Sequence, residues 1–352
     1  MNATQTPTLS VVMTSFNGGR FIREQLASLA AQSLRPDELL VCDDGSTDDT
    51  LEIVADFQQD APFPVWIQRN PARLGYADNF LQACSLAAGN LIAFCDQDDV
   101  WQPAKLERCV AAFVADAAVV LAIHSAEVVD GGLQPRGFCK PDFAVSEVLA
   151  PRGGELEFSL PGFAMVLSAS LVRTIDWRNR ARDYMKADRP LMAHDQWLLF
   201  LARSLGRVAQ LSDPLVLYRQ HGGNTCGATD AGRPPVPTLQ RAANQAAYWQ
   251  RAEASDYYSA FLSGLTGKVA GEKRATLQAS AGHYRRQAET YAARALLYMN
   301  DCTRWGRMRT YAGLWKRGAY RSRRARGLGW RAGVKDAGAL LFGESNPLRF
   351  FQ

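Results

Sequence analysis

Carboxylates follow two short apolar runs in this sequence at a spacing that could hold a metal ion. Asp43 and Asp44 come directly after LLVC, and Asp96 and Asp98 come directly after LIAFC. Two carboxylates one residue apart at the end of a buried strand repel each other unless a positive charge compensates them. Mg²⁺ and Mn²⁺ prefer hard oxygen ligands and keep positions open for phosphate oxygens. The segment Asp96-Gln97-Asp98 therefore favours a divalent cation held together with a diphosphate, and the alternative is an acidic loop that caps the following helix.

The elements that would position these residues alternate between strand and helix. We predict strands over residues 9–13, 39–42, 65–68 and 91–95, separated by helices over 21–31, up to about 57, and 76–88. This alternation indicates an α/β fold with a mostly parallel sheet, right-handed crossovers and helices on both faces. Ligands bind at the carboxyl ends of the strands in such sheets. Those ends carry TSFN at 14–17, Asp43-Asp44 and Asp96-Gln97-Asp98, so we expect one polar site at that edge.

The remainder of the chain predicts a second half of this domain and a helical region. We expect a strand over 119–129, an irregular stretch over 133–159, a helix over 194–205 and a short strand over 215–218. Residues 1–226 form one domain in this interpretation, with halves at about 8–125 and about 126–226, which the family resemblance described below implies to be a nucleotide-sugar half and an acceptor half. A Gly- and Pro-rich linker covers 227–238, and 239–352 is a helical, basic C-terminal region.

Bulk composition narrows the class of protein. The chain has 352 residues, a net charge of +5 and seven cysteines with no Cys-x-x-Cys spacing, so neither a disulfide framework nor a zinc knuckle is indicated. No apolar run approaches the roughly 18 residues of a membrane-spanning helix, and Met1–Thr8 has no features of a signal peptide. We expect a cytoplasmic protein, peripheral at the inner face of the cell membrane.

Six segments together resemble family 2 of the inverting glycosyltransferases, which has the GT-A fold, and within it the bacterial rhamnosyltransferase-like members. The segments occur in the family's order within residues 8–226: LSVVMTSFNGGRFIREQLASL, VCDDGSTDDT, RLGYADNF, LIAFCDQDDVW, AHDQWL and YRQHGGNT. The resemblance implies transfer of a sugar from a nucleotide donor to an acceptor.

The resemblance assigns a donor-binding role to one group of residues. Phe16 would lie against the nucleotide base, with Thr14 and Asn17 nearby. Asp43 would accept the imide N–H of a uracil or thymine ring. Arg73 would pair with the base edge or with a phosphate. Both contacts stay open because this loop varies within the family.

A second group would act at the diphosphate and the reacting sugar. Asp96 would contact the ribose or a metal-bound water, and Asp98 would bind Mg²⁺ or Mn²⁺ directly. His221 would be a further metal ligand or a diphosphate contact, and the fork of Arg219 would match phosphate oxygens. Asp195 would be the general base that removes the proton from the acceptor hydroxyl. The alternative for Asp195 is a cap of the helix after it, and the two roles are compatible.

Two further segments keep more than one interpretation. Residues 162–165 resemble the acceptor side of the family but equally suit a tight turn. Between Arg304 and Lys335 there are eleven Lys or Arg, no Asp or Glu, and interleaved Trp and Tyr. This composition is typical of a segment that lies on an anionic membrane, and we expect peripheral contact through 304–352. A solvated or oligomeric helical face is the alternative, and we expect no nucleic acid partner.

The function predicted from these observations is transfer of L-rhamnose from dTDP-rhamnose, by an inverting and metal-dependent reaction, to a glycan or lipid-linked glycan acceptor in cell-surface polysaccharide assembly. The donor follows from the resemblance alone. Another dTDP- or UDP-hexose transferase is the first alternative, and a non-catalytic nucleotide-sugar or membrane-binding module is the second. A processive synthase is disfavoured because Asp301 stands where its Gln-x-x-Arg-Trp segment would begin.

Overall fold

The computed structural model describes residues 7–151, 160–173, 175–224, 241–299, 302–321 and 328–341. The chain divides into two compact units. The first comprises Met1–Ala181, Leu191–Ala231 and Gly267–Thr276, and the second comprises Arg182–Pro190, Gly232–Thr266 and Leu277–Gln352. The expected linker at 227–238 lies outside the described residues.

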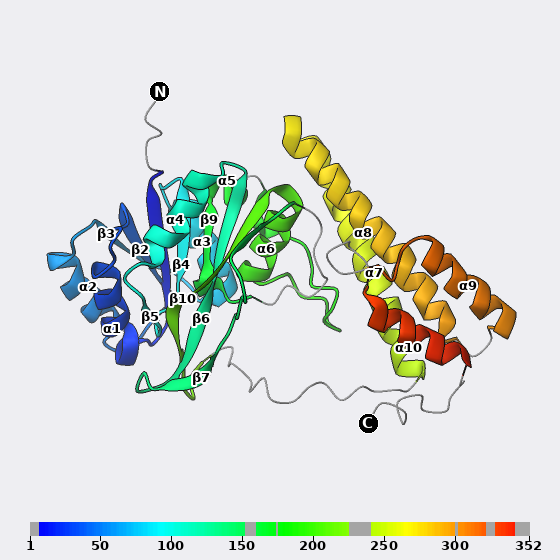
Figure 1. Cartoon of the computed structure of the whole chain (residues 1–352). Coiled ribbons are helices and arrows are strands. Elements are labelled where there is room, and N and C mark those ends of the chain that lie inside the picture. The colour runs from blue at the N-terminus through cyan, green and yellow to red at the C-terminus, as the bar shows by residue number, and fades with distance from the viewer. Residues whose placement is uncertain are drawn as a thin grey trace. The chain divides into compact units, whose positions relative to one another are not determined.

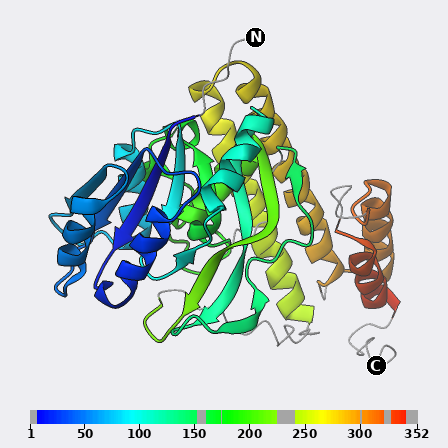
Figure 2. The ribbon, with the colours of Figure 1, turned by 60° about the vertical axis from the view of Figure 1, so that its left-hand side comes forward.

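A twisted ten-stranded sheet forms the centre of the first unit (Figures 1 and 2). Its main path runs β3-β2-β1-β4-β9-β6-β10-β5, with β7 paired to β6 and β8 paired to β10. The strands are β1 (Leu9–Ser15), β2 (Glu38–Asp43), β3 (Val65–Arg69), β4 (Leu91–Cys95), β5 (Val100–Trp101), β6 (Val119–Asp130), β7 (Pro135–Cys139), β8 (Glu147–Leu149), β9 (Met165–Ser168) and β10 (Arg207–Gln220).

The first four strands pair in parallel, as the sequence predicts, because each is joined to the next by a helix. Strands β1 and β4 are apolar on both faces, and helices cover both, which accounts for their continuous hydrophobic runs. The short strand β9 runs antiparallel between β4 and β6 and joins the two halves of the sheet. The expected α/β fold class, with a mostly parallel central sheet and a helical C-terminal region, is confirmed.

Strand β10 is much longer than the strand predicted at 215–218. It begins at Arg207 and pairs in parallel with β6 through register shifts on both sides of Pro214. Proline has no N–H to donate to the hydrogen bonds between strands and is found at bulges of this kind. Asp213-Pro214 therefore predicts the end of a strand from sequence, although β10 continues past it. Strands β7 and β8 lie in the stretch that was expected to be irregular.

Helices lie on both faces of the sheet. On one face α3, α5 and α6 pack on one another, and on the other face α1 contacts α2. Gln32, just after α1, accepts a hydrogen bond from Leu106 N in α4. The helices are α1 (Gly19–Ala30), α2 (Thr50–Asp60), α3 (Tyr76–Leu86), α4 (Lys105–Ala115), α5 (Ala169–Arg173) and α6 (His194–Leu205), with 3₁₀ turns at Gly162–Ala164 and Trp177–Asn179. The helix predicted over 194–205 is found with those limits.

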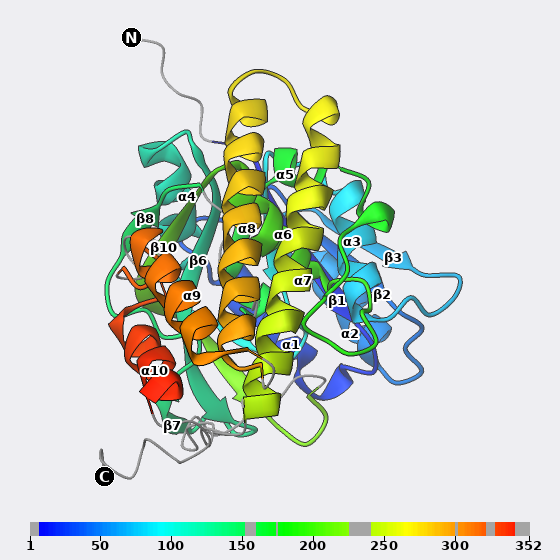
Figure 3. The same ribbon diagram turned by 90° about the vertical axis from the view of Figure 1, so that its right-hand side faces the viewer.

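Four helices make up most of the second unit. The long helices α7 (Arg241–Leu265) and α8 (Gly271–Leu297) lie side by side, and α9 (Arg304–Lys316) packs against α10 (Trp330–Leu341) (Figure 3). A core of tyrosines, leucines and alanines joins α7 and α8 to α9 and α10. No described helix of the chain is both long and apolar enough to cross a bilayer.

A buried ion pair fixes α10 on the long helices. The fully buried carboxylate of Asp336 accepts hydrogen bonds from Arg294 Nε and Nη2 at 2.7 and 3.0 Å. The hydroxyls of Tyr298 and Tyr320 donate to the same carboxylate at 2.8 Å each. A buried charge is tolerated only when it is paired and hydrogen-bonded, and Asp336 meets both conditions.

The units differ from the predicted division in two described segments. Gly267–Thr276 was expected in the C-terminal region but belongs to the first unit. Residues 182–190 were expected within the acceptor half of the first domain but belong to the second unit. Within that unit, Tyr257 and Tyr258 hydroxyls accept hydrogen bonds from the backbone N–H groups of Arg182 and Tyr184, at 3.0 and 3.3 Å. Local periodicity could not reveal this, because the segment has no helical or strand pattern of its own.

Candidate active site

A cavity of about 830 Å³ opens at the carboxyl ends of β1 and β4, within the first unit. Its walls come from the loops after these strands, the start of α3, the start of α6 and the end of β10. The predicted site residues that line it are Thr14, Phe16, Asn17, Arg73, Asp96, Asp98, Asp195 and His221. Parallel strands therefore bring their polar ends together as the sequence indicates, and only Asp43 and Arg219 of the predicted set lie outside the lining.

Asp98 and His221 meet at one side of this cavity. Nε2 of His221 lies 2.8 Å from Oδ2 of Asp98, and Nδ2 of Asn224 lies 3.4 Å from the same oxygen. Asp98 follows β4, whereas His221 and Asn224 follow β10. The His221 ring also packs on Phe21 of α1, with ring centroids 4.5 Å apart. A carboxylate and an imidazole are thus fixed side by side on two different elements.

Arg219 holds these two elements together instead of facing the cavity. Its side chain is 2% exposed, and its guanidinium donates to Asp98 O at 2.7 Å, to Gly131 O at 2.9 Å and to the carboxylate of Glu24. Its backbone N–H donates to Asp99 Oδ1 at 2.9 Å. The expected diphosphate contact does not fit this placement, because the guanidinium is buried and its donors are taken by protein oxygens. The geometry gives Arg219 the task of holding the backbone at Asp98 next to β10.

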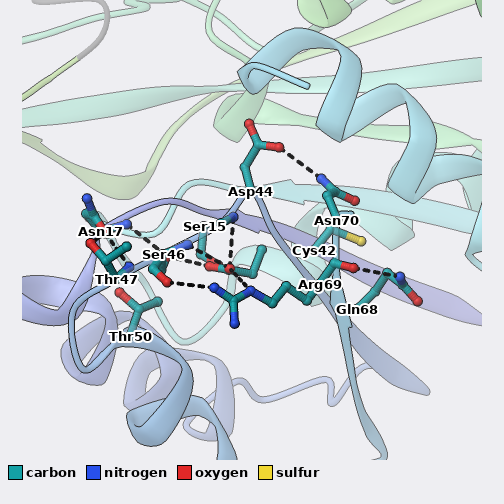
Figure 4. Close-up of polar contacts among 12 residues, drawn as sticks. Ser15, Asn17, Cys42, Asp44, Ser46, Thr47, Thr50, Gln68, Arg69 and Asn70 are labelled. Atoms are coloured by element: carbon teal, nitrogen blue, oxygen red, sulfur yellow. Dashed lines mark hydrogen bonds and ion pairs between the residues drawn. The ribbon is translucent and has the colours of Figure 1, made fainter. Parts of the chain in front are cut away.

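The neighbouring carboxylates of Asp43 and Asp44 take different positions. Asp43 is fully buried and accepts from Ser15 Oγ at 3.0 Å, from the N–H groups of Gly45 and Ser46 at 3.0 and 2.9 Å, and from Ser46 Oγ. Figure 4 shows Ser15, Ser46 and Arg69 in this cluster, and Asp44 directed toward Asn70. Asp43 was expected to meet the base, but its oxygens are engaged by the turn that follows β2.

Asp44 is the carboxylate of this pair that lines the cavity. It accepts hydrogen bonds from Leu74 N at 2.7 Å and Gly75 N at 2.8 Å, so it also holds the loop that carries Arg73. Sequence reasoning missed this residue because the two aspartates are adjacent and identical. Strand alternation was the available signal, since adjacent residues at the end of a strand point to opposite sides.

The loop after β1 presents an aromatic ring covered by a cation. The guanidinium carbon of Arg73 lies 3.8 Å from the centroid of the Phe16 ring. Gln97, the middle residue of Asp96-Gln97-Asp98, accepts from Phe16 N at 2.9 Å and donates to Phe16 O at 3.1 Å. Asn17, with φ of 47°, accepts from Thr47 N at 2.9 Å. The loop with Asp96-Gln97-Asp98 and the loop after β1 are therefore directly coupled, a link that the sequence did not suggest.

Acidic groups crowd the floor of the cavity. Burial raises the pKa of Asp96 to about 7, and the negative charges of Asp98 and Asp195 add to the shift. Burial and the charges of Asp98 and Asp96 also raise the pKa of Asp99 well above its usual range. The repulsion among these carboxylates would be relieved by a cation at the mouth of the cavity.

Lys105 lies beneath the acidic cluster and was not predicted as a site residue. It is fully buried, its Nζ donates to Phe163 O at 2.7 Å, and it lies 3.2 Å from the centroid of the Trp101 ring. Burial lowers its pKa to about 7, against the opposing influence of Cys95, Cys109, Asp99 and Asp96. Its charge therefore offsets only part of the negative charge above it.

Asp195 lies in the first turn of α6 and lines the cavity. Its Oδ1 accepts from Gln196 N at 2.7 Å, so it satisfies one of the free N–H groups at the helix start. Asp195 also lies near the acidic cluster, since its negative charge contributes to the raised pKa of Asp96. A carboxylate at this position on the cavity wall could act as a base. The capping role and the catalytic role are compatible in this geometry, as the sequence analysis expected.

His194 and Gly162 form a tight contact beside Asp195. The His194 ring is buried, stacks on Phe80 with centroids 4.3 Å apart, and lines the cavity. A methyl group added to Gly162 would come within 2.4 Å of His194 Nε2. Burial lowers the pKa of His194, so the ring is neutral near pH 7. Gly162–Ala164 forms the tight turn that was one interpretation, and Gly162 and Phe163 line the cavity, so a place on the acceptor side stays a prediction.

The residues present fit a divalent cation that is shared with a ligand. Among the described residues, no three His, Cys, Asp or Glu side chains are grouped so that they could hold a metal by themselves. Asp98 and His221 provide one oxygen and one nitrogen at a site with excess negative charge. Mg²⁺ and Mn²⁺ bound to nucleotides take their other ligands from phosphate and water. A cation held jointly by these two residues and a diphosphate is consistent with the arrangement.

Comparisons with known proteins agree with this geometry. Residues 10–171 match the model of the family described as glycosyl transferase family 2. An uncharacterized glycosyltransferase of Nostoc sp. is 26% identical over 229 residues, which cover 61% of this chain and 66% of that protein. The dTDP-rhamnosyl transferase RfbG of Shigella flexneri is 28% identical over 247 residues, which cover 68% of this chain and 81% of that protein.

The chain spans less than two thirds of the length of the first curated relatives, at 66% of the Nostoc protein and 59% of an uncharacterized Mycobacterium bovis protein. Among solved structures, residues 1–349 of Staphylococcus aureus TarS in complex with UDP-GlcNAc superpose with a TM-score of 0.52 at 19% identity, covering 90% of this chain and 93% of that one. At this identity the likeness concerns the fold alone. The matched family model, the curated relatives and the fold agree, and residues 10–171 of this chain form a glycosyl transferase family 2 domain.

Proposed function

We propose that this protein transfers a sugar from a nucleotide donor to an acceptor hydroxyl, with inversion at the anomeric carbon. The observation that carries the proposal is the meeting of Asp98 and His221 at 2.8 Å on the wall of a cavity that Asp195 also lines. A metal pair and a carboxylate base are the two parts that the reaction needs. Asp98 and His221, after β4 and β10, are our candidates for the metal pair, and Asp195, in the first turn of α6, is our candidate for the base.

Asp195 acts as the base in this proposal. Its carboxylate accepts the proton of the acceptor hydroxyl while that oxygen forms the new bond to the anomeric carbon. The bond between that carbon and the diphosphate oxygen breaks in the same step, and its electron pair leaves with the nucleoside diphosphate. Asp98 and His221 would hold the divalent cation, which, when bound, offsets the charge that develops on the leaving diphosphate.

Phe16, Arg73 and Asp44 form the nucleotide end of the site. Arg73 covers the Phe16 ring, and a base entering there would stack between them or displace the guanidinium toward a phosphate. Asp44, rather than Asp43, is the carboxylate we assign to the base or ribose, because it lines the cavity. A uracil or thymine ring would present an N–H to such an acceptor.

For the donor we propose dTDP-L-rhamnose, and for the pathway the assembly of a cell-surface polysaccharide. Support comes from RfbG, which is described as a dTDP-rhamnosyl transferase and aligns over 68% of this chain at 28% identity. UDP-hexoses are the alternative donors, since the TarS structure of similar fold holds UDP-GlcNAc. We further propose a lipid-linked glycan as the acceptor and a location at the inner face of the cell membrane.

The test is release of nucleoside diphosphate from a panel of dTDP-, UDP- and GDP-sugars by the full chain with Mn²⁺ or Mg²⁺. The Asp195→Asn variant serves as the matched control, because it keeps the cavity and removes the base. Release with one donor that requires Asp195 supports the proposal. Nucleotide binding without turnover, on glycan and lipid-linked acceptors alike, would favour a non-catalytic nucleotide-sugar module instead.

A further inference from the structure

The helices α9 and α10 carry large apolar side chains that face solvent. On α9, Trp305, Met308, Ala312 and Trp315 are all exposed, with Trp305 at 76% and Trp315 at 54%. Their spacing of three, four and three residues places them along one face of the helix. On α10, Trp330 at 67% and Val334 at 50% are exposed one turn apart. Monomeric proteins rarely leave such large side chains grouped on one part of their surface.

The charges around these side chains are all of one sign. The exposed basic residues of α9, α10 and the residues directly after α9 are Arg304, Arg309, Lys316, Arg317, Arg321, Arg331 and Lys335. Asp336 is the one acidic residue among the described residues 302–321 and 328–341, and it is fully buried against Arg294. By contrast α7 contains Glu253 and Asp256, and α8 contains Glu272 and Glu289. The single sign is therefore particular to α9 and α10.

The second unit holds this surface rigidly. Leu314 of α9 is buried in the tyrosine-rich core, and Tyr311 Oη donates to Gly333 O of α10 at 3.2 Å. Thr303 caps α9 by accepting from Gly306 N at 3.1 Å. The tryptophans and arginines thus stand on helices whose opposite faces are already packed. The Trp315 ring also meets the rings of Tyr311 and Tyr320, with centroids 6.4 and 5.3 Å apart, but Trp315 remains 54% exposed.

We propose that the exposed face of α9 and α10 is a docking surface for an anionic lipid bilayer. Tryptophan is enriched at the level of the lipid headgroups, where its apolar ring and its N–H are both accommodated. Lysine and arginine near the surface are attracted by anionic headgroups. Helices that lie in the plane of the interface combine basic residues on a polar face with Trp and other apolar side chains on the face that enters the headgroup region. The same bilayer would hold the lipid-linked acceptor. Only this use of the docking surface rests on the proposed function.

Charge also argues against a second copy of the chain as the occupant. A symmetric dimer would place the same surface on both sides of the interface, so that Arg304, Arg309 and their basic neighbours would face one another. Like charges at close range repel, and no exposed carboxylate among the described residues of α9 and α10 is available to offset them. A bilayer with anionic lipid provides the opposite charge over an extended area.

The experiment is co-sedimentation of the full chain with vesicles of phosphatidylcholine alone and of phosphatidylcholine with phosphatidylglycerol. Two double variants are compared with the wild type: Trp305→Ser with Trp315→Ser, and Arg304→Glu with Arg309→Glu. Their matched controls lie in the first unit. Trp66→Ser removes a tryptophan that is 58% exposed, and Arg178→Glu reverses an arginine whose side chain is 67% exposed.

We expect binding to the anionic vesicles only, with a partition coefficient about tenfold or more lower in both double variants. The controls should bind as the wild type does. All variants should stay folded at the assay temperature, although Trp315→Ser removes ring contacts with Tyr311 and Tyr320 and should lower the melting temperature slightly. Equal binding by wild type and double variants would overturn the proposal. So would binding that ignores the anionic lipid, or a dimer that the tryptophan variant dissociates while vesicles bind nothing.

Oligonucleotide binding that is lost in the same variants, without vesicle binding, would likewise overturn the proposal and assign the surface to nucleic acid. Failure of the proposed enzymatic function can be recognised separately. The Asp98→Ala and Asp195→Asn variants should bind vesicles as the wild type does, whatever their activity. Conversely, sugar transfer without vesicle binding would remove the docking surface and leave the proposed reaction intact.

Discussion

Nε2 of His221 lies 2.8 Å from Oδ2 of Asp98, although 123 residues separate the two in the chain. The contact exists because Arg219 joins the end of β10 to the backbone carbonyl of Asp98 and to the carboxylate of Asp99. A carboxylate and an imidazole placed in this way could share a cation without rearrangement of the backbone. The buried arginine that was expected to bind phosphate therefore positions Asp98 next to His221.

Substitutions of the two adjacent aspartates after β2 should have different effects, one on stability and the other on nucleotide binding. Asp43→Ala leaves several buried donors without an acceptor, so we expect unfolding free energy to fall by about 3 kcal/mol. Asp44→Ala should instead weaken nucleotide binding, because this carboxylate lines the cavity and holds the Arg73 loop. Urea unfolding and titration with UDP and dTDP measure the two effects.

Asp213→Asn is the control for both substitutions, since Asp213 does not line the cavity, is partly exposed and is paired with Arg108. It should change neither quantity beyond the small effect of a surface ion pair. If Asp43→Ala proved stable and lost nucleotide binding while Asp44→Ala did not, the assignment of the two carboxylates would have to be exchanged.

Replacement of Asp195 by asparagine should separate binding from chemistry. Asparagine keeps an oxygen that can accept from Gln196 N and so preserves the start of α6. Because the base is lost, we expect the transfer rate to fall about 10²- to 10⁴-fold while donor affinity stays near that of the wild type. Single-turnover kinetics and calorimetric titration of the donor measure both. A large loss of donor affinity at unchanged rate would mean that Asp195 binds the donor and is not the base.

Metal affinity should depend on pH through Asp96. In the cation-free protein the pKa of Asp96 is raised to about 7, first by burial and then by Asp98 and Asp195. Its proton must leave for the full negative charge of the site to form, so Mn²⁺ affinity in the presence of nucleotide should fall as pH is lowered from 8 to 6. The limiting slope for one displaced proton is about tenfold per pH unit.

The same titration on the Asp96→Asn variant provides the control for this pH dependence. Asparagine cannot ionise, so the slope between pH 8 and pH 6 should become shallow even if overall affinity is lower. The direction of the Asp96 pKa shift can also be checked through the pH dependence of the free energy of unfolding. Because the folded pKa is raised, the cation-free wild type should gain stability from this group as pH falls through 7. A slope in Asp96→Asn equal to that of the wild type would place the titrating group elsewhere.

The buried ion pair of the second unit should dominate its stability. Asp336→Ala leaves the Arg294 guanidinium and two tyrosine hydroxyls without their acceptor, at a cost of about 3–5 kcal/mol. The double variant Arg294→Met with Asp336→Leu should recover much of this loss, because no unpaired charge remains. Glu253→Gln, at an exposed pair with Arg189, is the control and should be nearly neutral. Urea unfolding would contradict this account if Asp336→Ala were as mild as Glu253→Gln.

Local pattern predicted the first half of the fold well. Strands β1, β2, β3 and β4 consist of short apolar runs bounded by turn residues, and each begins within one residue of its predicted start. The helix at 194–205 was equally clear. The strand predicted at 215–218 was too short, because a bulge accommodates Pro214 within the parallel pairing of β10 with β6. This arrangement depends on the partner strand, and local sequence does not reveal it.

The candidate site was predictable in its location but only partly in its details. Strand ends that share one edge explain why Thr14, Asp96 and Asp98 line a common cavity. The approach of His221 to Asp98 rests on tertiary pairing of β10 and came from family resemblance alone. Asp44, Gln97 and Lys105 were missed because their roles depend on which way a side chain points and on what lies beneath the loop.

The most direct test of the central claim is thermal unfolding of the wild type and the Asp98→Ala variant with dTDP and UDP, each with and without Mn²⁺. Ligands that bind the folded state raise the melting temperature. The account predicts a rise for the wild type that needs both nucleotide and metal, and that disappears in Asp98→Ala while Asp213→Asn keeps it. A rise of equal size in Asp98→Ala, or one that does not require the metal, would contradict a shared cation at Asp98 and His221.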